Sequence, residues 1–343
     1  LLYGNVRHGI ELARQASRYL SKDDVFLQSM VTWLLGLTQY FTENGTATDQ
    51  VPSGLVESSE AAGNIFMALL NVYMSGQLQM VQGRLRQAME TFRQGLRLAQ
   101  TDSLASGIGW DEQPSLGVSL MYQGLGFVSR EQNKLDEAER YLTECIELSE
   151  QWGNAEVLVD AYVFLAQLRQ AQGDIRSAID AFHKARQLLQ EHKVSPLTIR
   201  LVEAYHAQVW VAQGDLASAA RWAVSLKRAQ VGGDDREELV LYVNAVEQST
   251  LARLRIAQQR FEEASEILRP LLQEMEGAGW MGLVLELLAL KALALHRQGK
   301  TTEALTTLHR ALSLAEPEGY VRVFVYEGAP MAELLRQAAA RGI

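Results

Sequence analysis

The chain has a single cysteine and only six prolines among its 343 residues. One cysteine excludes an internal disulfide and fits a reducing compartment, so we expect a cytoplasmic protein. Cys145 falls on a small-residue position of the repeat described below, and we interpret it as a core residue rather than a nucleophile. Because proline ends helices, its scarcity suits a nearly all-helical chain.

Long apolar segments without charge are also missing. The nearest candidate, residues 281–295, carries Glu286 and Lys291 and so lacks the uncharged length of a membrane span. The chain also has no charged start followed by an apolar stretch, which is the pattern of a signal peptide. The sequence therefore predicts no membrane contact.

Positive charge is in deficit. The 41 Asp and Glu residues outnumber the 32 Lys and Arg residues, and the formal net charge is −9. Nucleic-acid binding calls for a basic face, so we expect this segment not to bind nucleic acid. DNA binding by another part of a longer protein stays open.

Motifs for catalysis and cofactor binding are absent from the sequence. There is no Gly-x-x-x-x-Gly-Lys loop, no His-Glu-x-x-His, and no pair of the six histidines with zinc-site spacing and a third ligand nearby. Gly124-Leu125-Gly126 is a fragment of a dinucleotide pattern, but it lies inside a predicted helix, where close helix packing explains it. His206 is interpreted as a satisfied core histidine on the inner face of its helix. We expect no enzyme, no metal and no cofactor in this segment.

What the chain does contain is a repeated pattern of small and apolar residues. It runs Gly, any residue, an aliphatic, two residues, Ala, three residues, a large apolar residue, two residues and a small one. The clearest copy reads Gly173-Ile175-Ala178-Phe182-Ala185. The anchoring position recurs at Gly9, Ala88, Ala138, Ala178, Ala219, Ala264 and Ala304. The first gap, of 79 residues, is about two periods and predicts one hidden copy near Gln50.

A period near 40, with apolar spacings of three, four and seven, indicates helical hairpins stacked into a solenoid. HEAT-like repeats share this period, but the Gly…Ala…Phe…Ala spacing is typical of tetratricopeptide repeats. In one preceding helix, Tyr122, Leu125 and Gly126 stand where that repeat has Trp, Leu and Gly. We predict an all-α, tetratricopeptide-like α-solenoid, a right-handed superhelix of about eight hairpins that forms a single domain over residues 1–343.

The turn between the two helices of a hairpin carries its own signal. Gln-Gly-Asp occurs at 172–174 and 213–215, and Gln-Gly-Lys at 298–300. Glycine can take the left-handed conformation that ends the first helix. Asp174 and Asp215 are then placed to cap the second helix.

The first helix of each tetratricopeptide hairpin lines the concave side of the superhelix. The position eleven residues before each anchor is predicted to point into that groove, and the positions fifteen and eight before it extend the same face. A row of glutamines there offers donors and acceptors for sugar hydroxyls, a peptide backbone or carboxylates. From these three positions we select a candidate ligand-binding set: Tyr73, Gln77, Gln123, Phe127, Arg130, Gln167, Gln208 and Arg253.

The first five members of this set form its best cluster. They place two aromatic rings and a cation on neighbouring repeats, which suits stacking on and orienting a small ligand. Two structural interpretations remain beside this one. Phe127 can serve as packing filler, and glutamine is a good helix former that often lies on a solvated face.

Several segments resemble the large MalT-like, LuxR-family ATP-dependent transcriptional activators. They read REQNKLDEAERYL at 130–142, WGN at 152–154, WVAQGDL at 210–216 and, most specifically, GYVRVFV at 319–325 with EGAPM at 327–331 and LL at 334–335. Tyr326 stands where the family pattern has Asp. The resemblance covers most of residues 60–343.

The resemblance implies an order of N-terminal signalling ATPase, tetratricopeptide-like sensor and C-terminal helix-turn-helix. Neither the ATPase motif nor the DNA-binding helices occur here, and residues 4–20 match a second helix without a first one before it. We therefore expect a fragment of a longer protein, with ATP bound only by a missing N-terminal domain. The resemblance also implies a small-molecule inducer, inhibitory regulatory proteins, and self-association of the parent protein on activation.

Two functions fit these observations. The first is a signal-sensing domain that binds an inducer or an inhibitory protein and so controls ATP-dependent assembly and transcription. The second is a stand-alone interaction scaffold that holds a peptide or partner protein. The residues themselves do not identify the inducer, the partner or the regulated genes.

Overall fold

The computed structural model describes residues 65–100, 114–192, 194–229 and 238–343, together with residues 15, 16, 18–20 and 31. Helices account for almost all of these residues, and the described parts of the chain contain no strand. The predicted repeats around Gly9 and Gln50 and the long loop expected at 101–115 fall almost wholly outside the described residues.

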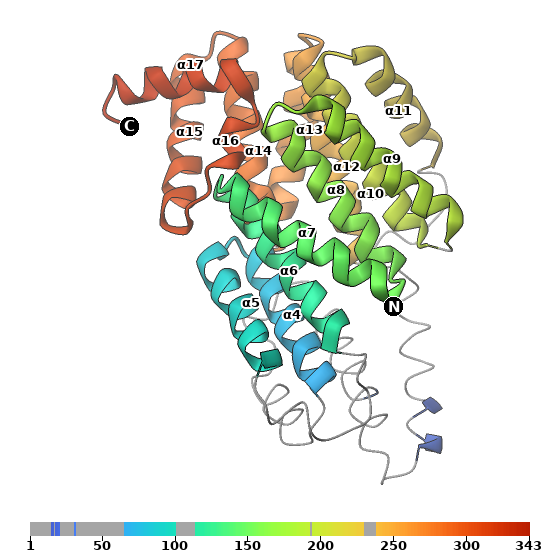
Figure 1. Ribbon diagram of the computed structural model, residues 1–343. Helices are drawn as coiled ribbons and strands as arrows, with labels where there is room; N and C mark the ends of the chain where they lie inside the picture. Colours follow the sequence, from blue (N-terminus) through green and yellow to red (C-terminus); the bar gives the residue numbers. More distant parts are fainter. Residues whose placement is uncertain are drawn as a thin grey trace.

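Twelve of the described helices pair into six hairpins, which follow one another along the superhelix in Figure 1. The pairs are α4 (Ile65–Val81) with α5 (Leu85–Gln100), α6 (Pro114–Glu131) with α7 (Leu135–Trp152), α8 (Ala155–Ala171) with α9 (Ile175–Glu191), α10 (Pro196–Gln213) with α11 (Leu216–Ala229), α12 (Glu238–Ala257) with α13 (Phe261–Gly277), and α14 (Met281–Arg297) with α15 (Thr301–Ala315). After them come a 3-10 turn, η2 (Glu316–Glu318), and the helices α16 (Arg322–Val325) and α17 (Gly328–Ala339). The predicted all-helical solenoid is confirmed.

The predicted anchors are fully buried residues on the second helix of each described hairpin. Ala88, Ala138, Ala178, Ala219, Ala264 and Ala304 each lie on the second helix, and each has no exposed surface. A larger side chain at such a position would overpack the core at a cost of about 1–3 kcal/mol. The small anchor residue is therefore a packing requirement of each repeat.

The turns inside the hairpins lie at a fixed distance from the anchors. The residue five before each anchor has a positive φ in all six hairpins: Gly83 (78°), Asn133 (59°), Gly173 (84°), Gly214 (79°), Gln259 (61°) and Gly299 (80°). The oxygen Oδ1 of Asp174 accepts a hydrogen bond from the Ser177 amide at 3.1 Å, and Asp215 caps α11 in the same way at 3.0 Å. Both predicted caps are confirmed.

Small residues in α6 allow its close contact with the neighbouring helices. Gly124 faces the ring of Phe92 on α5, and a Cβ on Gly124 would lie only 2.4 Å from that ring. Gly126 faces Leu142 on α7 in a similar way. The Gly-Leu-Gly fragment is thus a packing feature of a helix, as predicted.

Cys145 is also buried in the core, where burial raises the pKa of its thiol to about 12.

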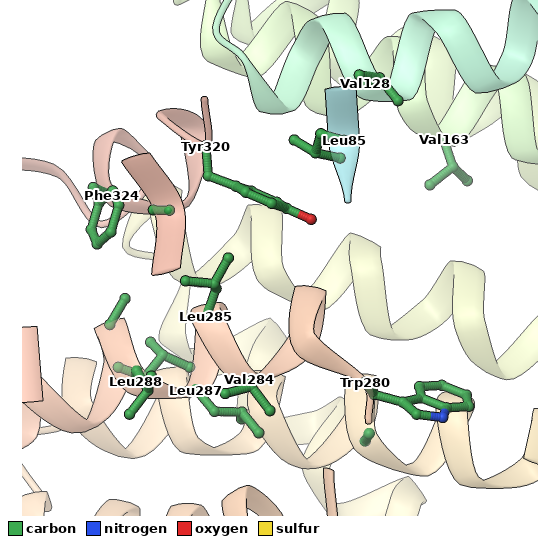
Figure 2. Packing of buried hydrophobic residues seen from close by; sticks show 14 of the residues in the cluster. Leu85, Val128, Val163, Trp280, Val284, Leu285, Leu287, Leu288, Tyr320 and Phe324 are labelled. Carbon is green, nitrogen blue, oxygen red and sulfur yellow. The ribbon is translucent and has the colours of Figure 1, made fainter. Parts of the chain in front are cut away.

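The described hairpins turn back on themselves. The end of α4 contacts the start of α14, where a Cβ on Gly83 would lie 3.0 Å from the Cβ of Met281. Figure 2 shows the same region, in which the ring of Tyr320 reaches between Leu85 of α5 and Leu285 of α14. One hydrophobic cluster accordingly runs from Val72 to Ala338. The inner surface of the superhelix is enclosed between its first and last described hairpins.

Candidate functional site

The first helices of the hairpins carry the predicted ligand set on a shared inner face, which we call the inner wall. Five members are buried, with exposed fractions of 8% or less: Tyr73, Gln123, Gln167, Gln208 and Arg253. The other three members, Gln77, Phe127 and Arg130, are half-buried. The inner wall is therefore more enclosed than the open groove expected from the sequence, because the superhelix closes on itself.

The first cluster joins α4 to α6. The Tyr73 hydroxyl donates a hydrogen bond of 2.7 Å to Oε1 of Gln123. The side chain of Gln77, one turn along α4, also interacts with this hydroxyl. Burial and the nearby carboxylate of Asp160 raise the pKa of Tyr73, so its hydroxyl stays protonated and remains a donor.

The second cluster joins α6 to α8. Arg130 donates a hydrogen bond to Oε1 of Gln167 and forms an ion pair of 2.6 Å with Glu131. Its guanidinium lies 5.1 Å from the ring centroid of Phe127 and 5.7 Å from that of Phe164. The two rings meet edge to face at 5.4 Å. Of the two rings that the sequence placed with Arg130, Phe127 lies beside it, but the second ring is Phe164 of the next repeat and not Tyr73.

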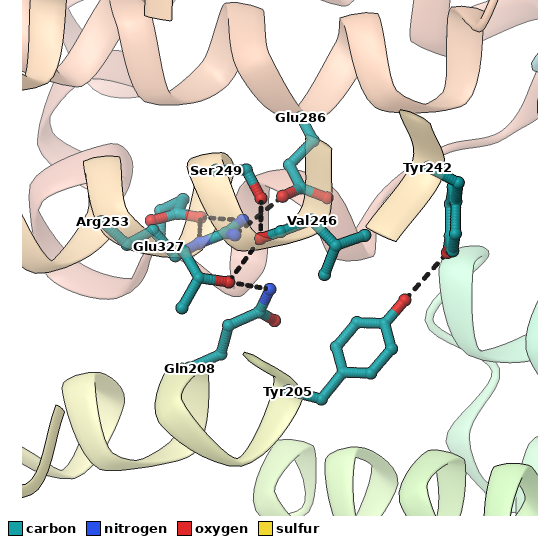
Figure 3. A network of polar contacts seen from close by, with 9 residues as sticks. Tyr205, Gln208, Tyr242, Val246, Ser249, Arg253, Glu286 and Glu327 are labelled. Carbon is teal, nitrogen blue, oxygen red and sulfur yellow. Dashed lines mark hydrogen bonds and ion pairs between the residues drawn. The ribbon is translucent and has the colours of Figure 1, made fainter. Parts of the chain in front are cut away.

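The third cluster joins α10 to α12 (Figure 3). Nε2 of Gln208 donates to the Thr250 hydroxyl at 2.9 Å, and that hydroxyl donates to the Val246 carbonyl at 2.7 Å. Nearby, the hydroxyls of Tyr205 and Tyr242 lie 2.9 Å apart. Burial raises the pKa of Tyr242 to about 12 and also raises the pKa of Tyr205. Both phenols are therefore neutral at ordinary pH, and either hydroxyl can donate this hydrogen bond.

The fourth cluster is centred on Arg253 of α12 (Figure 3). Its guanidinium lies 2.7 Å from a carboxylate oxygen of Glu286 on α14 and 2.9 Å from one of Glu327, which precedes α17. It also lies 5.3 Å from the ring centroid of Tyr326. Burial alone would lower the pKa of Arg253, but the two carboxylates raise it, so the guanidinium stays charged.

Sequence reasoning missed seven residues of these four clusters. None of them stands at the three register positions used to select the set: Phe164, Tyr205, Tyr242, Thr250, Glu286, Tyr326 and Glu327. Glu286 lies 18 residues before its anchor, one helical turn beyond the position fifteen before it, so extending the register would have found it. Tyr326 and Glu327 follow the last repeat, where the register gives no signal.

Taken together, the inner wall offers amides, phenols, guanidinium groups and aromatic rings that are held in place by bonds between repeats. Such groups can recognise a polar ligand or a peptide. Within the described ranges, no group of three or more His, Cys, Asp or Glu side chains could hold a metal ion. None of the helices placed by the structure has both the length and the apolar character needed to cross a membrane.

His206 is buried on α10, as predicted, but one of its two ring nitrogens lacks a hydrogen bond within the described part of the chain. Its ring stacks on Phe182 with centroids 4.7 Å apart and contacts Trp210 at 4.1 Å. Its Nδ1 atom has no hydrogen-bond partner among the described residues. The expectation of a satisfied core histidine is corrected on this point, because aromatic contacts surround the imidazole.

Comparison with known proteins gives two findings. A family model described as the MalT-like TPR region matches residues 2–341. Among solved structures, the chain is similar to a Signal Transduction ATPase with Numerous Domains (STAND) protein with a tetratricopeptide repeat sensor, PH0952 from Pyrococcus horikoshii. Sequence identity is 13% and the TM-score is 0.47. The similarity covers 98% of this chain and 53% of that one, so this chain spans about half the length of that protein.

Proposed function

Because the chain belongs to the MalT-like TPR region family, we propose that it is the sensor domain of a MalT-like, LuxR-family transcriptional activator. In this proposal it binds a small inducer, an inhibitory protein, or both. The parent protein then assembles in an ATP-dependent manner in the cytoplasm and activates transcription. ATP and DNA are bound by other domains of that parent protein, and this segment binds neither.

The observation that supports this proposal most strongly is the arrangement of bonds along the inner wall. Tyr73 with Gln123, Arg130 with Gln167, and Gln208 with Thr250 each join neighbouring hairpins. A ligand that exchanges one of these bonds for its own therefore changes how two repeats pack. It shifts the domain between two shapes only by the difference in its affinity for them.

The proposed site contains the eight inner-wall residues predicted from the sequence. The Arg130 cluster is the part best suited to a small ligand, because a guanidinium that keeps 12% of its side chain exposed there faces two aromatic rings. The rings provide a stacking surface, and the guanidinium together with Gln167 orients polar groups.

A thermal unfolding screen of the chain against small polar metabolites tests the site. A compound that binds only the native state at about 100 times its Kd stabilises it by about 2.7 kcal/mol. We expect such a compound to raise the Tm of the wild-type chain and of an Arg97→Gln control, since Arg97 lies on the outside of α5. Arg130→Gln should abolish the effect. An equal shift in both variants would place the binding site elsewhere.

The link to transcription is tested by the DNA on both sides of this segment. A phosphate-binding loop encoded upstream and a helix-turn-helix encoded just after Ile343 are the expected result. A start codon near Leu1 and a stop codon after Ile343 would contradict the proposal.

One observation favours a second function, a protein-interaction scaffold. Tyr73 with Gln123, Gln208 with Thr250 and Arg253 with Glu286 already bond to one another, so these buried side chains have partners without any small ligand. In that case a peptide or partner protein is bound, and no small molecule changes the stability of the chain. A partner whose capture is lost in Arg130→Gln, together with a negative metabolite screen, would favour the scaffold.

A further inference from the structure

The segment that follows the last hairpin does more than end the superhelix. Residues 318–327 run from η2 through α16 to the start of α17, and α16 lies beside α6 and α14 (Figure 1). This segment therefore contacts both an early and a late hairpin. We call it the clasp.

On one side, the clasp is bound to the turn between α6 and α7. The Val321 amide donates a hydrogen bond of 3.0 Å to the backbone carbonyl of Glu131. Arg322 donates to Oδ1 of Asn133 at 3.4 Å, and Nε2 of Gln132 lies 3.5 Å from the Glu318 carbonyl. All three contacts join residues more than 180 positions apart in the sequence.

The clasp also caps a helix of the first described hairpin. A carboxylate oxygen of Glu318 accepts a hydrogen bond of 3.0 Å from the Arg86 amide, in the first turn of α5. That turn contains no acidic residue of its own. A carboxylate at a helix N-terminus satisfies a free amide and interacts favourably with the helix dipole. Glu318 thus caps the N-terminus of α5 from a distant part of the chain, as Asp174 caps α9 from the position just before that helix.

On the other side, the clasp reaches the inner wall. Glu327 pairs with Arg253, and the exposed fractions of their side chains are only 11% and 7%. The ring of Tyr326 lies within 6.0 Å of the guanidinium groups of both Arg253 and Arg322. Arg253 is shared with Glu286, which belongs to α14 and not to the clasp. The clasp is therefore joined to the inner wall by a buried charge pair, in addition to the apolar contacts of Tyr320 and Phe324, and the arginine of that pair has a second carboxylate partner.

We propose that the clasp is a regulatory latch that holds the superhelix closed and that opens when Glu327 leaves Arg253. Opening frees residues 318–322 and α16 from the α6–α7 turn while Glu286 keeps Arg253 paired. An event at the inner wall is thereby transmitted to the C-terminal end of the domain. The contacts that close the latch all lie within this chain. A role of the latch in signalling rests on the proposed function.

Hydrogen exchange of the 343-residue chain without any effector tests the latch. In Glu327→Gln we expect amides of residues 318–339, with Val321 as the clearest reporter, to exchange about tenfold faster or more. Amides of α8 and α9 should keep their wild-type rates. Glu286→Gln is the matched control, because it also removes one carboxylate from Arg253 but leaves the clasp attached, and it should leave residues 318–339 protected.

A second variant probes the far end of the clasp. Glu318→Ala removes the cap on α5 without touching Arg253 and should also speed exchange in residues 318–339. Unchanged exchange there in both Glu327→Gln and Glu318→Ala would overturn the latch, as would an equal increase in Glu286→Gln. Because the exchange experiment contains no effector, its result is independent of whether a ligand is found. A negative ligand screen likewise does not change the conclusion about the latch.

Discussion

At the scale of single residues, the turn inside each hairpin is the position under the strictest conformational demand. Every described hairpin puts the residue five before its anchor in the left-handed region, yet two of the six residues there are not glycine. Asn133 tolerates this region because its short polar side chain adapts to it, and it also accepts the Arg322 hydrogen bond. Gln259 has neither advantage, so its turn carries conformational strain.

Replacing Gln259 with glycine should therefore stabilise the chain. The left-handed conformation costs a side-chain-bearing residue about 1–2 kcal/mol, and the greater freedom of glycine in the unfolded chain offsets part of the gain. We expect urea unfolding to show a net stabilisation of about 0.5–1 kcal/mol. Gln258→Gly next to it, where φ is not positive, should destabilise the chain. Equal effects of the two substitutions would contradict this account.

His206 gives the chain a predictable dependence on pH. Burial, followed by the charges of Arg186 and His183, lowers its pKa from 6.5 to about 4. Between these values the unfolded chain binds a proton that the folded chain does not, so stability falls as pH falls from 6.5 toward 4. At pH 5 the loss from this group should reach up to about 2 kcal/mol relative to pH 7.

A phenylalanine variant isolates this contribution. His206→Phe keeps a ring against Phe182 and Trp210 and removes both the titration and the unpartnered Nδ1. Urea unfolding at pH 5 and pH 7 should differ less for this variant than for the wild type. A pH dependence that is the same in both proteins would show that His206 is not its source.

At the scale of the element, pairs of small residues let large ones cross between helices. The ring of Phe92 on α5 fits against Gly76 of α4 and Gly124 of α6, and a Cβ on either glycine would lie 2.4 Å from it. The repeat pattern predicted the large residue at this position, since Phe92 lies four residues after its anchor. It did not predict that Gly76 and Gly124 face this ring, because they belong to other helices.

Gly124→Ala should therefore destabilise the chain by about 1–3 kcal/mol, because the added Cβ would force the fully buried Phe92 ring to shift. Gly277→Ala is a matched control at the exposed end of α13, where an added Cβ meets nothing within 4 Å. Alanine is the better helix former by about 1 kcal/mol, so the control should be neutral or stabilising. Thermal or urea unfolding distinguishes the two, and a stabilised Gly124→Ala would refute the packing argument.

At the scale of the whole molecule, closure of the superhelix distinguishes one hairpin turn from the others. Gly83 and Gly299 occupy equivalent turns, with φ of 78° and 80°. A Cβ on Gly299 meets nothing within 4 Å, whereas one on Gly83 approaches Met281 to 3.0 Å. The first turn therefore lies in the contact between α4 and α14.

Alanine at these two turns should separate local strain from closure. Gly299→Ala incurs only the left-handed penalty of about 1–2 kcal/mol. Gly83→Ala incurs that penalty plus the crowding against α14, which adds about 1–3 kcal/mol. Urea unfolding of both variants measures the difference, and hydrogen exchange should show Gly83→Ala loosening α14 as well. Equal losses would mean that the α4–α14 contact contributes little.

The sequence by itself determined the repeat, the hairpin register, the turn residues and the first helices that bear the candidate ligand set. These features can be predicted because helical periodicity and turn residues are local signals, and the same signals recur in the six described hairpins. Only the tertiary structure decided that the inner wall is enclosed, that Arg253 is shared by Glu286 and Glu327, and that Glu318 caps a helix 232 residues away. These contacts join segments that are far apart in the chain, and each occurs only once among the described residues, so the repeat pattern of the sequence does not predict them.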